Sequence, residues 1–456
     1  MRIAVSPRSA LWRLGFSRRN LELLLVVAGL GIGWLALFSV QQAMERPASV
    51  ELWILWTVVG AALVGHLSIR FLAAAADPFI YPVALLLNLL GLVMIHRLDL
   101  TDEIRTDPGE TFAPAAPGQA TWFAVGIGLF AVVLLLLRDH RQLQRYTFTS
   151  MVLGIVMLLL PLVPLLGVTL NGARLWIRIG SLSFQPAEAA KILLPVFFAG
   201  YLARRRLNML SISHRWLGIG IPRLRDVGPI VVAWAVSLLV LISQRDLGTS
   251  LLFFGLFVGL LYMATGQRTW LALGAVLFTA GASAAYLLFS HVKLRVSVWL
   301  DPFAYAHDEG YQLAQALYGF ASGGIFGRGL GQGFSWLVPY AKSDFILTSF
   351  GEELGYAGLA ALLLLYAIII QRILRLSLIA RDEFGKLLSM GLALVLALQV
   401  FVVLGGVSRL IPLTGLTAPF LAAGGSALVA NWVMVALLLR ISSTTAALNL
   451  PAGGAA

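Results

Sequence analysis

Apolar residues form long continuous blocks along the chain, and short polar stretches separate them. Most blocks approach the roughly 20 residues with which an α-helix crosses the hydrocarbon core of a bilayer. Membrane barrel strands would alternate apolar and polar residues instead. The pattern therefore predicts an all-α, polytopic membrane protein with about twelve transmembrane helices. The predicted spans are 21–40, 52–69, 79–95, 122–137, 148–168, 187–202, 227–242, 247–263, 271–289, 354–370, 387–404 and 423–439.

The composition supports this interpretation. Of the 456 residues, 59% are hydrophobic and only 12% are charged, whereas soluble domains carry about 25% charged residues. The chain has no cysteine, which excludes disulfides, thiolate catalysis and cysteine metal sites. Its six histidines are scattered without ligand spacing, so no structural zinc site is expected.

Positive charge orients the spans. Most Lys and Arg residues fall in the segments that share a side with the N-terminus, and the positive-inside rule makes that side cytoplasmic. Both termini are therefore predicted to be cytoplasmic, and the first apolar block is interpreted as a retained span rather than a signal peptide. The positive-inside arrangement of these segments accounts for the net charge of +12, so no nucleic-acid partner is expected. The acidic stretch 99–110 falls outside.

The first polar motif on the outer side covers residues 171–191. Glu188 and Lys191 lie three residues apart, on one face of the helix that begins the sixth span. One interpretation is an interfacial anchor, with Trp176 at headgroup depth and snorkelling arginines. The other is a cationic site for an anionic lipid headgroup such as a diphosphate, in which Arg174 and Arg178 would take part. Composition alone favours the anchor.

The second motif, 244–249, sets Arg245 beside Asp246 between the seventh and eighth spans. The two charges could neutralise each other in a turn. Ionisable residues at membrane level are nevertheless costly and are often functional. The sequence leaves both alternatives open.

The third motif lies in the longest polar interval, 290–353, which is rich in glycine and aromatic residues and is expected to be a structured outer loop. Its glycine-rich part, 319–333, follows no strand, so it favours close backbone packing or a re-entrant turn over a nucleotide site. Asp344 stands next to apolar residues at the mouth of the tenth span. A desolvated carboxylate there would have a raised proton affinity and suit a general base. The alternative role is a helix N-cap.

The fourth motif combines Pro412–Phe420 with a Gly-Gly-Ser stretch, residues 424–426. Proline and glycine at membrane level favour a broken or re-entrant helix that lines a cavity. A plain loop before a helix is the alternative.

Taken together and in this order, the motifs resemble the SEDS family (shape, elongation, division and sporulation), which comprises the RodA, FtsW and SpoVE proteins. The matching segments are 171–191, 246–249, 299–303, 310–312, 323–327, 343–346, 351–355 and 413–426. The resemblance implies a ten-span core over 77–441 that contains the outer loop 290–353. Residues 1–76 would add a cytoplasmic N-terminus and a two-helix hairpin, as in actinobacterial members of RodA type. Residues 442–456 would be a disordered cytoplasmic tail.

The family polymerises lipid II into peptidoglycan glycan strands, releases undecaprenyl diphosphate, and works with a class B penicillin-binding protein, a transpeptidase that crosslinks the strands. The resemblance implies an inverting glycosyltransferase in the bacterial plasma membrane, among membrane lipids, with its active site facing outside. Asp344 would be the catalytic residue. The candidate substrate-binding residues are Arg174, Arg178, Gln185, Glu188, Lys191, Arg245, Asp246, Glu352, Gly425 and Ser426. The motifs contain no dedicated metal site and imply no certain cofactor, although a divalent cation (Mg²⁺ or Mn²⁺) is compatible with this chemistry.

This chain departs from the family pattern at three places. Arg245 stands where many members have proline, and Lys342 where a small or acidic residue is common. Residues 422–427 lack three of the usual hydroxyl side chains. A lipid II flippase or another transporter is the competing class, and a scaffold that only activates its partner is a third. The chain shows no convincing repeat between its halves, which disfavours a transporter. A role in elongation rather than division is favoured but not decided.

Overall fold

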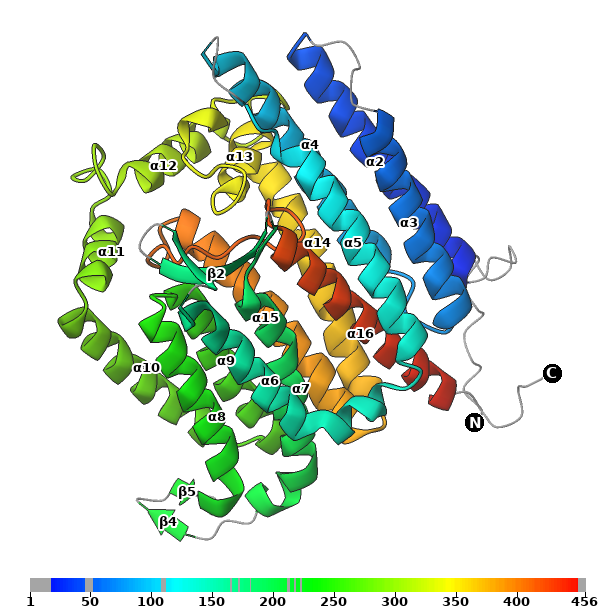
Figure 1. Cartoon of the computed structure of the whole chain (residues 1–456), viewed down its shortest axis with the longest axis vertical. Helices are drawn as coiled ribbons and strands as arrows, with labels where there is room; N and C mark the ends of the chain where they lie inside the picture. The colour runs from blue at the N-terminus through cyan, green and yellow to red at the C-terminus, as the bar shows by residue number, and fades with distance from the viewer. Residues whose placement is uncertain are drawn as a thin grey trace, which may run out of the picture.

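The computed structural model describes residues 18–45, 52–107, 112–164, 166–170, 173–180, 182–210, 214–216, 219–221 and 224–449. Within them the fold is a bundle of long helices, which confirms the all-α prediction (Figure 1). Eleven helices are long and apolar enough to cross a membrane, and the remaining predicted span matches α8, whose described apolar part, Gly228–Ser243, is shorter. The long helices are α2 (Arg18–Ala43), α3 (Leu52–Leu72), α4 (Ile80–Arg105), α5 (Ala115–Leu136), α6 (Thr147–Leu159), α7 (Pro186–Leu210), α8 (Leu224–Ser243), α9 (Leu247–Thr265), α10 (Thr269–Leu288), α14 (Gly355–Ile379), α15 (Glu383–Val407) and α16 (Gly425–Asn449).

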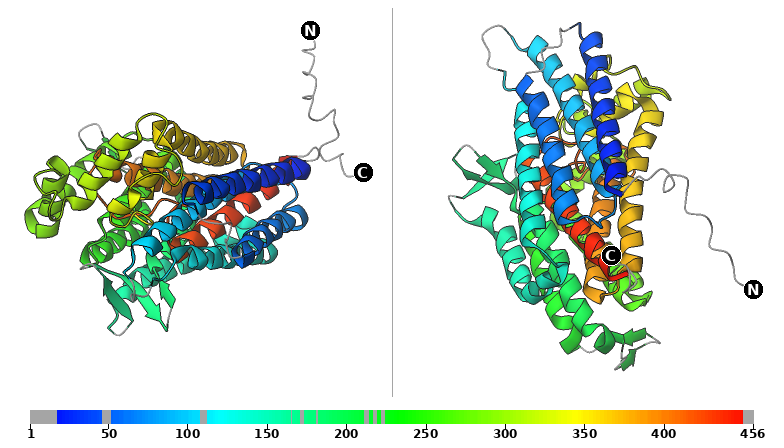
Figure 2. Two further views of the ribbon diagram at one scale, coloured as in Figure 1. Left: turned by 90° about the horizontal axis from the view of Figure 1, so that it is seen from above. Right: turned by 90° about the vertical axis from the view of Figure 1, so that its right-hand side faces the viewer.

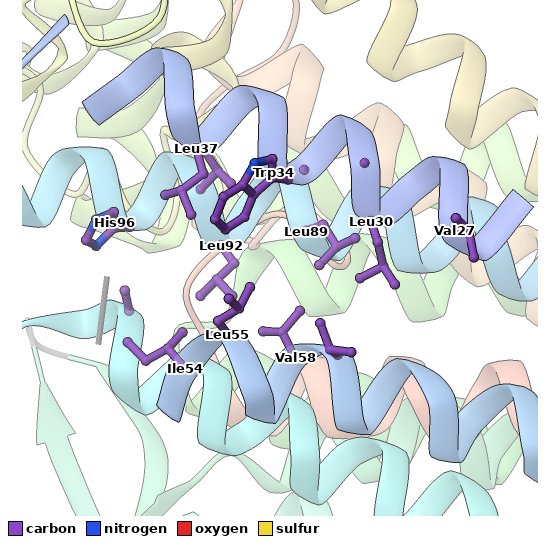
Figure 3. A pocket seen from close by; sticks show the side chains of 15 residues that line it. Val27, Leu30, Trp34, Leu37, Ile54, Leu55, Val58, Leu89, Leu92 and His96 are labelled. Carbon is purple, nitrogen blue, oxygen red and sulfur yellow. The ribbon is translucent and has the colours of Figure 1, made fainter. Parts of the chain in front are cut away.

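The N-terminal hairpin lies along one side of the bundle (Figures 1 and 2). Helix α2 packs against α4, and α3 packs against α5. Between the hairpin and α4 an apolar cavity of about 400 Å³ remains, with Trp34, Val58, Leu92 and His96 in its lining (Figure 3). The core itself is built around α15, which packs against α7, α9 and α14. Helix α15 is apolar and buried on most sides, so it forms the centre of the bundle.

The outer loop is structured, as predicted. It contains α11 (Ser290–Leu300), α12 (Tyr311–Gly323), a 3₁₀ turn at Ser335–Leu337 and α13 (Ile346–Glu353). Figure 1 places α12 and α13 at one end of the long helices and the small hairpin of β4 (His214–Trp216) and β5 (Ile219–Ile221) at the opposite end. The loop therefore forms a cap over one end of the bundle.

Two predicted boundaries are wrong. The fifth span was expected to continue to residue 168, but α6 ends at Leu159 and a 3₁₀ turn ends at Leu162. The following residues form an antiparallel sheet of β1 (Gly167–Leu170), β2 (Ala173–Ile179) and β3 (Leu182–Phe184), in which Val168 pairs with Trp176. At the other end of the chain, α16 continues to Asn449, so residues 442–449 are helical rather than disordered.

Candidate active site around Asp344

Asp344 lies in the turn that leads into α13. The N-cap of α13 is Phe345, which makes no side-chain capping bond, so the Asp344 carboxylate is not used as a helix cap. The backbone amide of Phe345 donates to the carbonyl of Tyr340 at 3.2 Å, and Tyr340 adopts a left-handed conformation with φ of 58°. Asp344 thus lies within a tight turn and not in the first turn of α13. The N-cap alternative is therefore excluded.

The surroundings of Asp344 fit a base. Burial raises the pKa of its carboxyl to about 6, against the lowering effects of a hydrogen bond from Ser343 and of the positive charge on Arg295. A Cβ built on Gly415 would lie 3.7 Å from Oδ2 of Asp344, so the carboxylate faces the loop of the fourth motif. The structure thus brings the third and fourth motifs together.

Arg295 of α11 was missed by the sequence analysis. Its Nη1 donates to the carbonyl of Leu413 at 2.9 Å and to that of Thr414 at 3.3 Å. Burial lowers the pKa of its guanidinium, while Asp246 and Asp344 raise it. Arg295 is therefore a cation between two carboxylates. The only sequence signal was its place just before the 299–303 segment, because the charge pattern alone treats it as one outer arginine among several.

Asp246 and Arg245 do not neutralise each other. Asp246 caps α9, accepting from the amide of Thr249 at 2.9 Å through Oδ1, while its buried Oδ2 has no hydrogen-bond partner in the described structure. Burial raises the pKa of Asp246, and the nearby charge of Glu188 adds to this rise. Arg245 is exposed and left-handed, with φ of 62°. The two residues therefore have separate environments.

The predicted pairing of Glu188 with Lys191 is confirmed. Nζ of Lys191 lies 2.5 Å from Oε2 of Glu188 and donates to Oε1 of Gln399 at 3.0 Å, and all three side chains are buried. The amide of Gln399 in turn donates to the carbonyl of Thr417 at 2.8 Å. This chain of contacts links α7 through α15 to the loop that faces Asp344. Lys191 is consequently a fixed, desolvated positive charge.

Gln185, Gly425 and Ser426 meet where α7 and α16 begin. The backbone amide of Gln185 donates to Oγ of Ser426 at 3.0 Å. A Cβ built on Gly425 would lie 2.5 Å from the ring of Trp122, so only glycine allows α16 to begin this close to α5. These residues therefore join the first and fourth motifs.

Three other predicted site residues have local structural contacts. Arg174 donates to the carbonyls of Val163 at 3.2 Å and Gly167 at 3.4 Å, which holds the connection into β1. Arg178 is exposed on β2. Glu352 accepts from the amide of Phe334 and from hydroxyls within the outer loop. No described contact joins these three side chains to Asp344, Asp246 or Lys191. Among the described residues, no group of three or more His, Asp or Glu side chains could hold a metal ion.

Comparison with known proteins gives the same assignment as the motif order. The family model described as cell cycle protein, covering FtsW, RodA and SpoVE, matches residues 78–447. Peptidoglycan glycosyltransferase RodA of Mycobacterium tuberculosis (strain ATCC 25618 / H37Rv) is 47% identical over 431 residues, covering 93% of this chain and 91% of the relative. Stage V sporulation protein E of Bacillus subtilis is 30% identical, covering 80% of this chain and 96% of the relative.

Solved structures share the fold of this chain. A chain from a peptidoglycan synthase complex that coordinates polymerization and crosslinking superimposes with a TM-score of 0.65 at 25% identity, covering 81% of this chain and 98% of that chain. The rod shape determining protein RodA of Thermus thermophilus shares the fold, with a TM-score of 0.54 at 24% identity over 80% of this chain and 96% of that one. This multi-pass bacterial membrane protein therefore belongs to the SEDS family of FtsW, RodA and SpoVE proteins.

Proposed function

We propose that this chain, a peptidoglycan glycosyltransferase of RodA type, polymerises lipid II into glycan strands with Asp344 as its general base. The observation that supports this assignment best is the buried environment of the Asp344 carboxylate, beside the Gly415 loop and Arg295. Its carboxylate faces the Gly415 loop, with Arg295 close enough to lower its pKa and burial holding that pKa at about 6. At neutral pH such a group is mostly ionised, yet it binds a proton more tightly than a free aspartate does.

The reaction is a displacement at the anomeric carbon of the growing chain. Asp344 takes the proton from the 4-hydroxyl of the acceptor sugar, and the hydroxyl oxygen forms the new glycosidic bond. The bond between the anomeric carbon and the diphosphate oxygen breaks, and undecaprenyl diphosphate leaves with the electron pair. A single displacement of this kind inverts the configuration at the anomeric carbon.

Departure of the diphosphate builds negative charge, which fixed cations stabilise most effectively in a water-poor site. Lys191 and Arg295 are the best supported for this role, because each is held by specific contacts that link it to the loop facing Asp344. Arg174 and Arg178, on the neighbouring sheet, are proposed to contact the lipid headgroup before reaction. Glu188 and Gln399 position Lys191.

A divalent cation fits one place in this arrangement. Mg²⁺ is commonly held by one or two carboxylates together with substrate phosphates, and Oδ2 of Asp246 is a buried carboxylate oxygen without a described partner. Asp246 would hold such an ion, with Glu188 nearby, and the ion would supply further positive charge to the leaving diphosphate. The substrate itself would provide the remaining ligands.

The partner and the orientation belong to the same proposal. Likeness to a chain of a peptidoglycan synthase complex supports assembly with a crosslinking class B penicillin-binding protein. The hairpin of β4 and β5, which belongs to the most basic of the segments predicted to be cytoplasmic, lies at the end of the bundle opposite α12 and α13. The Asp344 site would then face outside, where the sugar headgroup of lipid II projects.

The test uses the purified full chain with its cognate partner and labelled lipid II. We expect glycan polymer from the wild type and from Asp308→Asn, a control in which an exposed aspartate of the same loop is changed. Asp344→Asn and Asp344→Ala should give no polymer while their thermal unfolding matches the wild type. Normal polymer from the Asp344 variants would contradict the assignment. Transfer of lipid II across vesicles without polymerisation would favour a flippase instead.

A further inference from the structure

A second cavity, separate from the contacts around Asp344, opens where α8 ends and α11 begins. Its volume is about 430 Å³. Polar groups in its lining come from both sides: Ser243 ends α8 and Arg245 follows it, while Ser290 and His291 begin α11. Leu239 of α8 and Leu288 of α10 complete its apolar side. The cavity is thus half polar and half apolar.

The polar half is electropositive. Arg245 and His291 are its ionisable lining residues, and no acidic side chain lines it. Burial and the positive charges of Arg245 and Arg295 all lower the pKa of the His291 imidazole. The Arg245 guanidinium, an imidazole that can donate a ring N–H and two hydroxyls, without a carboxylate, form a lining suited to an anion.

The apolar half of the cavity lies on the side of the helices that would face the bilayer. Leu239 is 67% exposed and Leu288 is 75% exposed, and both stand at the ends of apolar helices. Helices α8 and α10 each pack against α9, so their exposed apolar sides flank the same neighbour. A hydrocarbon chain lying along these helices would bring its headgroup to the cavity.

We propose that this cavity binds the phosphate headgroup of a membrane lipid, with Arg245 and His291 contacting the phosphate and the lipid chain lying against α8 and α10. The phosphate belongs either to a polyprenyl diphosphate or to an acidic phospholipid. The proposal goes beyond glycosyl transfer, because binding requires no reaction at Asp344.

The cavity also communicates with the reaction site. Arg295 acts electrostatically on His291 on one side and on Asp344 on the other. Arg245 directly precedes Asp246, whose carboxylate also interacts with Arg295. A phosphate in the cavity therefore adds negative charge beside the cation that tunes the base.

The test measures equilibrium binding to the purified full chain in a neutral detergent. The probes are farnesyl diphosphate, a short-chain phosphatidylglycerol and, as a zwitterionic control, a short-chain phosphatidylcholine. The variants are Arg245→Asn, Arg245→Lys and His291→Gln. Asparagine tolerates the left-handed backbone of residue 245, so Arg245→Asn removes the charge without forcing the turn to change. Lys293→Gln is the matched control, because Lys293 is an exposed cation on α11 that does not line the cavity.

We expect Arg245→Asn and His291→Gln each to weaken binding of the anionic lipid by about tenfold, as befits loss of a charge-assisted hydrogen bond. Arg245→Lys should retain most of the affinity, and Lys293→Gln should change it by less than about twofold. Equal losses in Arg245→Asn and Lys293→Gln would overturn the proposal, because they would show general surface charge. So would unchanged binding in both Arg245→Asn and His291→Gln.

The two anionic probes identify the source of the phosphate. Tighter binding of farnesyl diphosphate, with the preference lost in Arg245→Asn, assigns the site to a polyprenyl diphosphate. Equal competition by phosphatidylglycerol assigns it to an acidic phospholipid. Both results support the anion site, and neither depends on polymerase activity. A failure of the Asp344 mechanism would therefore leave this binding result unchanged.

Discussion

Lys342 and Asp99 form an ion pair in which Nζ of Lys342 lies 2.6 Å from Oδ1 of Asp99. Lys342 stands two residues before Asp344, and Asp99 belongs to α4. The same carboxylate accepts hydrogen bonds from the first amides of α5, at Ala115 (3.0 Å) and Ala116 (2.7 Å). Asp99 thus joins α4 and the start of α5 to the turn that carries the proposed base. We expect Lys342 to position this turn, because the ion pair anchors it to α4.

Replacing Lys342 by methionine should lower kcat by about tenfold and leave the KM for lipid II nearly unchanged, because the turn that holds Asp344 loses its anchor while the other motifs stay in place. The buried Asp99 carboxylate would lose its cation, at a cost of about 1–3 kcal/mol in stability. Steady-state polymerisation and thermal unfolding measure the two effects. Lys342→Arg should restore most of the rate. Wild-type turnover in Lys342→Met would rule out the positioning role.

The polymerisation rate should depend on the ionisation of Asp344. A general base acts as the carboxylate, and burial raises the pKa of this group to about 6. Below that pH the group is protonated and the rate falls, and above it the rate reaches a plateau. Arg295 lowers the pKa of Asp344, so Arg295→Gln should move the rising limb to higher pH. Initial rates across a pH series measure the position of the limb, and a limb that stays in place would exclude this electrostatic coupling.

The spans could be predicted from the sequence because membrane insertion depends on length and apolar content, which are local properties. The pairing of Glu188 with Lys191 was predictable for a similar reason, since helix geometry places residues three apart on one face. The end of the fifth span was not predictable in this way. Residues 163–168 are as apolar as the helix before them, and pairing with β2 decides that part of this segment forms a strand.

The rest of the site depends on contacts between distant segments. Arg295 acquires its role from the Leu413 carbonyl and from Asp344, neither of which is near it in sequence. Sequence spacing likewise could not decide whether Asp344 caps α13, because the answer lies in the turn from Tyr340 to Phe345. The motif order predicted which segments matter, and the tertiary structure determines which side chains face each other.

Glu352 provides a test of a candidate substrate-binding residue. Its Oε1 accepts from the amide of Phe334 at 2.8 Å, and its Oε2 accepts from Oγ of Ser335 at 2.8 Å. Because both oxygens are used within the loop, Glu352→Gln should lower the thermal unfolding temperature and leave the KM for lipid II unchanged. Glu309→Gln, at an exposed position of the same loop, is the control and should change neither quantity. A raised KM at normal stability would return Glu352 to the substrate site.

Arg97 and Glu353 form a buried ion pair that ties α4 to the end of α13, and their side chains are 1% and 0% exposed. Arg97 also donates to the carbonyl of Gly333 at 2.6 Å, and Glu353 accepts from the amide of Gly331 at 2.8 Å. Arg97→Met leaves the carboxylate buried without its cation, which should cost about 3–5 kcal/mol of unfolding free energy.

The double variant Arg97→Met/Glu353→Gln should be less destabilised than the sum of the two single variants, because it removes both buried charges together. A double-mutant cycle from denaturation in mixed micelles measures this coupling. Strict additivity would show that the two side chains stabilise the cap independently, through their separate bonds to Gly333 and Gly331 rather than through each other.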